Sequence, residues 1–141
     1  VGYHNGKNSE GTNLIEAKKF ANESGVDAMA ISVGNTHLQT NKIAKIDIKK
    51  IKDIQSVTNI PLVLHGSSGI SYQMRKKIAF NTNVAKFNIG TELRMVAGNS
   101  LRENVKKNTN IFDRLKLIKP TIAKIKNQTK KVITNIGVTN E

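Results

Sequence analysis

The stretch that decides the fold is residues 60–69, IPLVLHGSSG, in which an apolar run ends in a histidine, two glycines and two serines. Residues 60–64 predict a buried β-strand, because a short apolar run bounded by turn residues is typical of strands covered on both faces. Ser71 follows as a helix cap, and the pattern predicts a helix to about Phe80. A strand that leads directly into a helix is the repeating unit of α/β folds with parallel strands.

The same unit recurs on both sides of this stretch. Apolar runs at residues 26–33 (VDAMAISV) and 84–88 (VAKFN) predict two further strands. Three strands cannot close a barrel, so the α/β pattern indicates the last three βα units of a (β/α)₈ TIM barrel or half of an open doubly wound sheet. The expected helices cover residues 14–24 with Gly25 as the stop, 47–57 with Asp47 as the cap, 90–107, and a last helix with Pro120 in its first turn that ends near Asn135.

The length and composition indicate one soluble domain over residues 1–141, with a mobile loop at 1–13 and a C-terminal helix and tail at 120–141. The start at Val1 suggests further sequence upstream. The chain has no cysteine, which excludes disulfides, thiolate catalysis and cysteine-ligated zinc. No apolar run approaches the ~20 residues that span a bilayer, and no signal peptide is visible, so we expect a cytoplasmic protein without a membrane partner.

The formal charge of +13 raises the question of nucleic-acid binding. The lysine pairs are scattered over different expected helices, and aromatic residues make up only 4% of the chain. Proteins that bind single-stranded nucleic acids usually also stack the bases on aromatic side chains. We therefore expect no nucleic-acid partner and keep a basic nucleic-acid-binding module as a less favoured alternative.

Each expected strand ends in a polar, glycine-containing segment: GNTH at 34–37, HGSSG at 65–69 and NIGTE at 88–92. In α/β folds, functional residues lie at the carboxyl ends of the strands. His37, His65 and Asn88 are therefore expected at one edge of the sheet. Because parallel neighbours lie ~4.8 Å apart, the two imidazoles can converge on one metal ion. The alternative is a pair of histidines that only form local hydrogen bonds.

The segments after the second and third strands also suit a phosphate group. Glycine lets the backbone approach an anion, serine and threonine add donors, and a following helix N-terminus favours negative charge. The alternative is a pair of strand-to-helix turns in which Ser71 and Thr91 act only as helix caps. The candidate phosphate-binding residues are Gly66, Ser67, Ser68, Asn88, Ile89, Gly90 and Thr91.

Taken together, VDAMAISVGNTH, IPLVLHGSSGI and VAKFNIGTEL resemble, in order and spacing, the late strands of the class II fructose- and tagatose-bisphosphate aldolases. The resemblance covers nearly the whole chain, and the combination of motifs is more specific than either part. It implies a (β/α)₈ barrel and a zinc-dependent, glycolysis-type aldol cleavage or condensation of a ketose 1,6-bisphosphate. The products of cleavage are dihydroxyacetone phosphate and an aldehyde phosphate. It also implies a homodimer or homotetramer.

Carried over by position, His37 and His65 match the two late zinc histidines of that family, and Asn88 matches a residue that contacts the enediolate. Leu38 departs from the pattern, because the family usually has a glycine there whose backbone helps to bind phosphate or a monovalent cation. The early zinc histidine and the proton-transfer aspartate belong to strands that this chain lacks. We therefore expect activity only as part of a longer protein. A phosphate-binding barrel of non-aldolase or lost activity remains the alternative.

Overall fold

The computed structural model describes residues 11–35 and 37–137. The chain divides into two compact units, Val1–Ile89 and Gly90–Glu141. The first holds a parallel sheet and its flanking helices, and the second holds two helices. Most of the expected opening loop falls on residues 1–10, which lie outside the described part of the chain.

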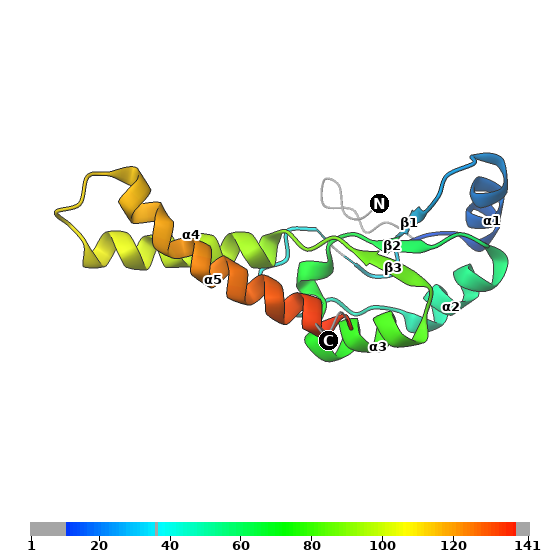
Figure 1. Ribbon diagram of the computed structural model, residues 1–141. Helices are drawn as coiled ribbons and strands as arrows, with labels where there is room; N and C mark the ends of the chain where they lie inside the picture. The colour runs from blue at the N-terminus through cyan, green and yellow to red at the C-terminus, as the bar shows by residue number, and fades with distance from the viewer. Residues whose placement is uncertain (1–10, 36, 138–141) are drawn as a thin grey trace. The chain divides into compact units, whose positions relative to one another are not determined.

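The sheet has three parallel strands in the order β1-β2-β3, as Figure 1 shows: β1 is Met29–Ile31, β2 is Leu62–Leu64 and β3 is Val84–Phe87. The predicted α/β class with parallel strands is confirmed. Every residue of the central strand β2 is buried, which explains its wholly apolar sequence. The strands are shorter than predicted, and β1 loses residues at both ends because an apolar run does not by itself set where ladder pairing stops.

Three helices of the first unit begin at polar caps. In α1 (Leu14–Glu23), α2 (Ile48–Val57) and α3 (Tyr72–Asn81), the side chains of Asn13, Asp47 and Ser71 accept hydrogen bonds from backbone amides of the first turn. The caps at Asp47 and Ser71 are the predicted ones. The core between sheet and helices contains seven fully buried apolar residues: Ile31, Ile51, Ile54, Leu62, Leu64, Ile70 and Ile78.

The second unit consists of α4 (Thr91–Lys107) and α5 (Arg114–Asn135), which pack against each other. The bounds of α4 and the end of α5 match the prediction, but the predicted start of α5 is wrong. Pro120 lies inside the helix, which begins earlier because Asp113 caps it by accepting from the Leu115 amide. Proline cannot donate to the carbonyl one turn earlier, yet a capped first turn and packing on α4 maintain the helix.

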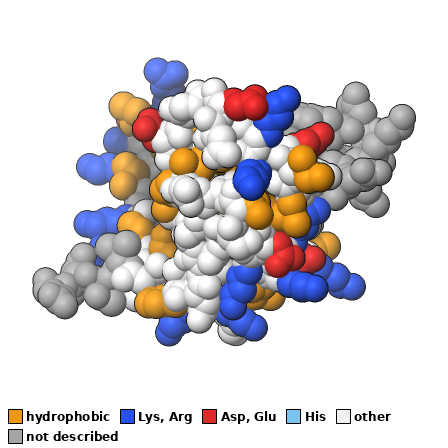
Figure 2. Space-filling model, turned by 90° about the vertical axis from the view of Figure 1, so that its right-hand side faces the viewer, with side chains coloured by type: hydrophobic (Ala, Val, Ile, Leu, Met, Phe, Trp, Pro, Cys, Tyr) orange, Lys and Arg blue, Asp and Glu red, His pale blue; other side chains and the backbone are white. Residues whose placement is uncertain are grey.

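Charged side chains are dispersed on the face of the protein drawn in Figure 2. Lysine and arginine side chains are spread around this face, with acidic and hydrophobic side chains between them. No helix of the described residues is both long and apolar enough to cross a membrane.

Candidate functional site

A bulge in β3 decides which residue faces His65. Leu62 pairs with Val84, but Val63 pairs with Lys86, so Ala85 is an extra residue in β3. The pairing of Leu64 with Phe87 therefore continues to His65 beside Asn88. The Asn88 amide donates to the Leu64 carbonyl over 2.8 Å. Without the bulge, His65 would lie opposite Phe87, so one inserted residue brings the amide side chain to the histidine.

Asn88 and His65 are in direct contact. The Nδ2 atom of Asn88 lies 3.1 Å from Nε2 and 3.3 Å from Nδ1 of the His65 ring. Because the amide nitrogen is a donor only, it bonds to whichever ring nitrogen carries no proton. Both side chains are half-buried, so they remain accessible to a small ligand. The contact favours the neutral form of His65, which is the form that ligates metals.

His37 joins this pair from the segment that follows β1. The ring centroids of His37 and His65 lie 5.7 Å apart in an edge-to-face arrangement, with an interplanar angle of 62°. The expected convergence of His37, His65 and Asn88 at the carboxyl edge of the sheet is therefore what the structure shows. The segment reaches this position through Gly34, whose φ of 96° and contact with the Lys45 carbonyl leave no room for a Cβ atom.

The pKa of His65 is lowered from its ordinary value of 6.5. Burial is the largest cause, because it disfavours the charged imidazolium, and the charges of His37 and Lys86 act in the same direction. At neutral pH the ring is consequently neutral and keeps one nitrogen lone pair. That electronic state suits a metal ligand better than a cation that must first lose a proton.

The donor set in the described residues is incomplete but compatible with a zinc ion. Zinc takes imidazole nitrogens at ~2.0–2.1 Å, and two rings in a tetrahedral shell would have centroids roughly 5–6 Å apart. The observed 5.7 Å fits that spacing. Within residues 11–35 and 37–137, no group of three or more His, Cys, Asp or Glu side chains gathers for a metal ion. A site with three protein ligands would need a donor from outside these described residues.

Asn35 is a buried residue beside the histidines that the sequence patterns did not single out. Its side chain accepts from the Val33 amide and donates to the carbonyls of Ile31 and His65. The sequence signal was present as a Gly-Asn pair at the end of a strand, but such pairs are typical of simple turns. The sequence therefore predicts only a loop residue at Asn35.

The glycine-serine turn after β2 adopts a left-handed bend and a short 3₁₀ segment. Gly66 has a φ of 62°, and Ser67–Gly69 form the 3₁₀ turn η1 before α3 begins. Ser67 is fully buried, its hydroxyl donates to the Leu64 carbonyl, and its amide donates to the Asn88 carbonyl. A phosphate contact through the Ser67 hydroxyl would require that bond to break, whereas its present role is to brace the turn beside Asn88.

The remaining candidates lie at the boundary of the two units. Ile89 ends the first unit, while Gly90 and Thr91 begin the second. The alternative in which Thr91 acts as the helix cap is not what the structure shows, because Gly90 occupies the cap position and Thr91 is the first residue of α4. Thr91 instead accepts a hydrogen bond from the Arg94 side chain over 3.1 Å. Without a side chain at Gly90, the first amides of α4 have no cap of their own.

Leu38 has a backbone conformation that usually belongs to glycine. Its φ is 59°, and it is the one non-glycine residue with a positive φ among the described residues. Its side chain is 75% exposed, so no burial of apolar surface offsets the unfavourable backbone geometry. The chain thus has a glycine-like bend directly after His37.

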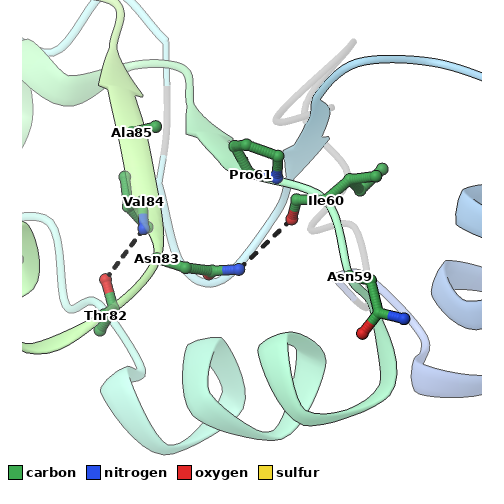
Figure 3. A pocket seen from close by; sticks show the side chains of 7 residues that line it. All are labelled: Asn59, Ile60, Pro61, Thr82, Asn83, Val84 and Ala85. Carbon is green, nitrogen blue, oxygen red and sulfur yellow. Dashed lines mark hydrogen bonds between the residues drawn. The ribbon is translucent and has the colours of Figure 1, made fainter.

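A pocket of about 420 Å³ lies at the opposite end of the strands, as Figure 3 shows. The Asn83 side chain bridges to the Ile60 carbonyl across this pocket, and Thr82 accepts from the Val84 amide. Because this is the amino end of the sheet, where α/β folds place structural residues, the histidine edge is the candidate site. The pocket is lined by Asn59, Ile60, Pro61, Thr82, Asn83, Val84 and Ala85.

Three aldolase structures, one of them putative, are similar to this chain. The YdjI aldolase from Escherichia coli K12 matches with a TM-score of 0.75 and 29% identity over 90% of this chain, which spans 44% of that protein. A putative fructose-1,6-bisphosphate aldolase from Coccidioides immitis matches over 89% of this chain and 42% of its own length (TM-score 0.71, 19% identity). The fructose-bisphosphate aldolase of Campylobacter jejuni matches with a TM-score of 0.68 and 15% identity, over 89% of this chain and 45% of its own length. The last two support the fold alone.

The sequence match extends over almost the whole chain. Residues 2–141 match the model of the family described as fructose-bisphosphate aldolase class-II. The match includes both histidine-bearing strand ends and the bulged strand that carries Asn88. The incomplete barrel is consistent with a chain that spans less than half of its structural neighbour from Escherichia coli. The chain therefore belongs to the class II fructose-bisphosphate aldolase family.

Proposed function

We propose that this chain is the C-terminal part of one (β/α)₈ barrel domain in a zinc-dependent aldolase. The substrate is a ketose 1,6-bisphosphate of the fructose or tagatose type, which is cleaved to dihydroxyacetone phosphate and an aldehyde phosphate. The observation that carries the proposal is the convergence of His37, His65 and Asn88 at the carboxyl edge of the sheet, in a chain of this family. The active protein is longer and, by resemblance to the family, a cytoplasmic homodimer or homotetramer.

In this proposal His37 and His65 hold the zinc ion through neutral ring nitrogens. When bound there, zinc would supply Lewis-acid polarisation of the substrate's carbonyl and hydroxyl oxygens. Asn88 supports the same chemistry from β3. Its Nδ2 now bonds to the His65 ring. If a metal ion engaged the His65 lone pair, the Asn88 amide would be free to donate a hydrogen bond to a substrate oxygen.

The phosphate group is proposed to bind at the turns that follow β2 and β3. The left-handed bend at Gly66 exposes backbone close to Asn88, and the absence of a Cβ there lets an anion approach. Ser67 braces this bend through its bond to Leu64. The contributing residues are Gly66, Ser67, Ser68, Asn88, Ile89, Gly90 and Thr91, with a monovalent cation beside the phosphate.

The proton-transfer aspartate and the third zinc histidine are assigned to the part of the longer protein that precedes this chain. The described residues contain no further His, Asp or Glu grouped with His37 and His65. This division of the active site would account for a histidine pair that has no acidic partner among the described residues of a proposed proton-transfer enzyme.

The test is retro-aldol cleavage of fructose and tagatose 1,6-bisphosphates by the full-length protein. We expect cleavage that disappears with a chelator, returns with zinc, and falls at least 100-fold in His65→Ala, because catalysis then lacks a ligand to the Lewis acid. Asn59→Ala, at the opposite end of β2, serves as the matched control and should retain activity. Cleavage that survives both chelator and His65→Ala would overturn the zinc assignment.

The same assay separates the aldolase proposal from a lost activity. A folded protein that binds zinc and cleaves neither sugar would contradict aldolase function and direct attention to Leu38, whose side chain replaces the usual glycine beside His37. Leu38→Gly should then restore cleavage if the leucine alone is responsible.

A further inference from the structure

We propose that Asn35 is a positioning residue that sets the spacing between His37 and His65 and thereby the metal affinity of the pair. Metal binding itself rests on the proposed zinc-dependent function. The spacing, in contrast, is a property of the chain in the absence of metal. Asn35 lies two residues before His37, and its side chain reaches the backbone of His65.

The Asn35 carboxamide replaces the next rung of the β1–β2 ladder. Strand pairing ends with Ile31 beside Leu64. Beyond that point, Nδ2 of Asn35 donates to the Ile31 carbonyl over 3.2 Å and to the His65 carbonyl over 3.0 Å. One side chain thus connects the ends of both strands where backbone pairing has stopped.

The same side chain also fixes its own segment. Its Oδ1 atom accepts a hydrogen bond from the Val33 amide over 2.7 Å. The carboxamide therefore uses its carbonyl oxygen and its amide nitrogen in three bonds, all to backbone groups. Such a group holds one rotamer, because any other rotamer leaves buried polar groups unsatisfied.

Burial protects the hydrogen bonds of the Asn35 side chain from competition with water. Asn35 is only 4% exposed, so water does not readily replace its bonds. On its other side, the His65 segment is held by the bond from the Asn88 amide to Leu64 and by the bond from the Ser67 amide to Asn88. Asn35 supplies the corresponding bond toward β1. The positions of the two histidine-bearing segments relative to each other consequently depend on its carboxamide.

The chain offers a matched control at the far end of the same strands. The Nδ2 atom of Asn83 donates to the Ile60 carbonyl over 3.3 Å, so it also connects two strand ends through an asparagine side chain. It does so at the amino edge of the sheet, away from the histidines. Asn83→Ala removes a comparable bond and tests whether any loss of strand bridging has the same effect.

The experiment compares wild type, Asn35→Ala, Asn35→Ser and Asn83→Ala in the full-length protein. Zinc affinity is measured by competition with a chromogenic chelator, and folding is checked by thermal unfolding. Loss of a residue that orients ligands typically costs 10–100-fold in metal affinity, so we expect a loss of about 10-fold or more in both Asn35 variants and none in Asn83→Ala. The serine variant is the milder change if Asn35→Ala does not fold.

A second measurement decides the proposal without metal. The ring-proton NOE between His37 and His65 should be present in metal-free wild type and Asn83→Ala, and lost in the folded Asn35 variant. An unchanged NOE with unchanged zinc affinity would overturn the positioning role. If wild type binds no zinc, the proposed zinc function fails, and the NOE alone decides whether Asn35 sets the histidine spacing.

Discussion

At the scale of single residues, Leu38 is strained by its backbone. A left-handed conformation costs an L-residue with a Cβ about 1–2 kcal/mol, whereas glycine adopts it freely. Because the Leu38 side chain is mostly exposed, its removal sacrifices little apolar burial. Replacing Leu38 with glycine would remove this backbone cost, but the greater conformational freedom of glycine in the unfolded chain would offset part of the gain in stability.

We therefore predict that Leu38→Gly raises the free energy of unfolding by about 0.5–1 kcal/mol. Ile122→Gly is the matched control, because Ile122 is 61% exposed but lies in the interior of α5, where glycine costs about 1 kcal/mol. Urea denaturation of the two variants should shift the midpoint in opposite directions. A destabilised Leu38→Gly would show that the leucine side chain forms an interaction of its own.

The lowered pKa of His65 makes the stability of the folded chain depend on pH. Because its pKa is lowered in the folded state, the unfolded chain binds more protons than the folded chain between that pKa and 6.5. Its contribution to stability is therefore fully present above pH 6.5 and is lost as the pH falls through the folded pKa.

We predict that His37→Gln raises the pKa of His65 toward 6.5 without restoring it fully. His37 is the second cause of the shift, after burial, and burial remains in the variant. Lys86→Gln should raise the pKa less, since Lys86 is the smaller electrostatic cause. The measurement is an NMR titration of the His65 ring protons, and a pKa that falls in His37→Gln would contradict this account.

At the scale of elements, α5 shows why one boundary could not be predicted from sequence. Proline favours the first turn of helices, so Pro120 suggested a start. The real start depends on Asp113 and on packing against α4, including the bond from Asn104 to the Leu117 carbonyl. Asp113 is itself a local cap signal, but Pro120 offers a competing start, and the tertiary contacts that decide between the two leave no local pattern in the sequence.

Replacing this proline should stabilise the helix. Pro120→Ala restores a backbone donor for the carbonyl four residues earlier and removes a steric clash, which is worth up to about 3 kcal/mol in a helix interior. Lys119→Ala, at the neighbouring exposed position, should change stability by less than about 0.5 kcal/mol. Chemical denaturation followed by circular dichroism measures both, and a destabilised Pro120→Ala would mean that the ring itself packs favourably.

The helix caps and the strand order could be predicted from the sequence, whereas the register of β3 could not. The caps at Asp47 and Ser71 and the parallel order were predictable, because side-chain oxygens at helix starts and buried apolar runs leave local signals. The bulge at Ala85 left none, although it brings Asn88 beside His65. The predicted meeting of His37, His65 and Asn88 thus depended on strand order alone, and the detailed contact depends on a register that only the structure reveals.

At the scale of the whole molecule, the chain spans 44% of the Escherichia coli aldolase that it resembles. We predict that residues 1–141 alone cleave no ketose bisphosphate, because the proposed proton-transfer group and third zinc ligand lie in the longer protein. The check is the retro-aldol assay on the isolated chain, with its helical content confirmed by circular dichroism, beside the full-length protein. Turnover by the isolated chain would contradict this division of the active site.

His37 and His65 are proposed to hold one zinc ion between their rings. The most direct measurement is X-ray diffraction from crystals of the zinc-loaded full-length protein, recorded on both sides of the zinc absorption edge. We expect one anomalous peak about 2.0–2.1 Å from a ring nitrogen of each of these two histidines. A zinc peak away from both rings, or no peak between them when both side chains are ordered, would contradict it.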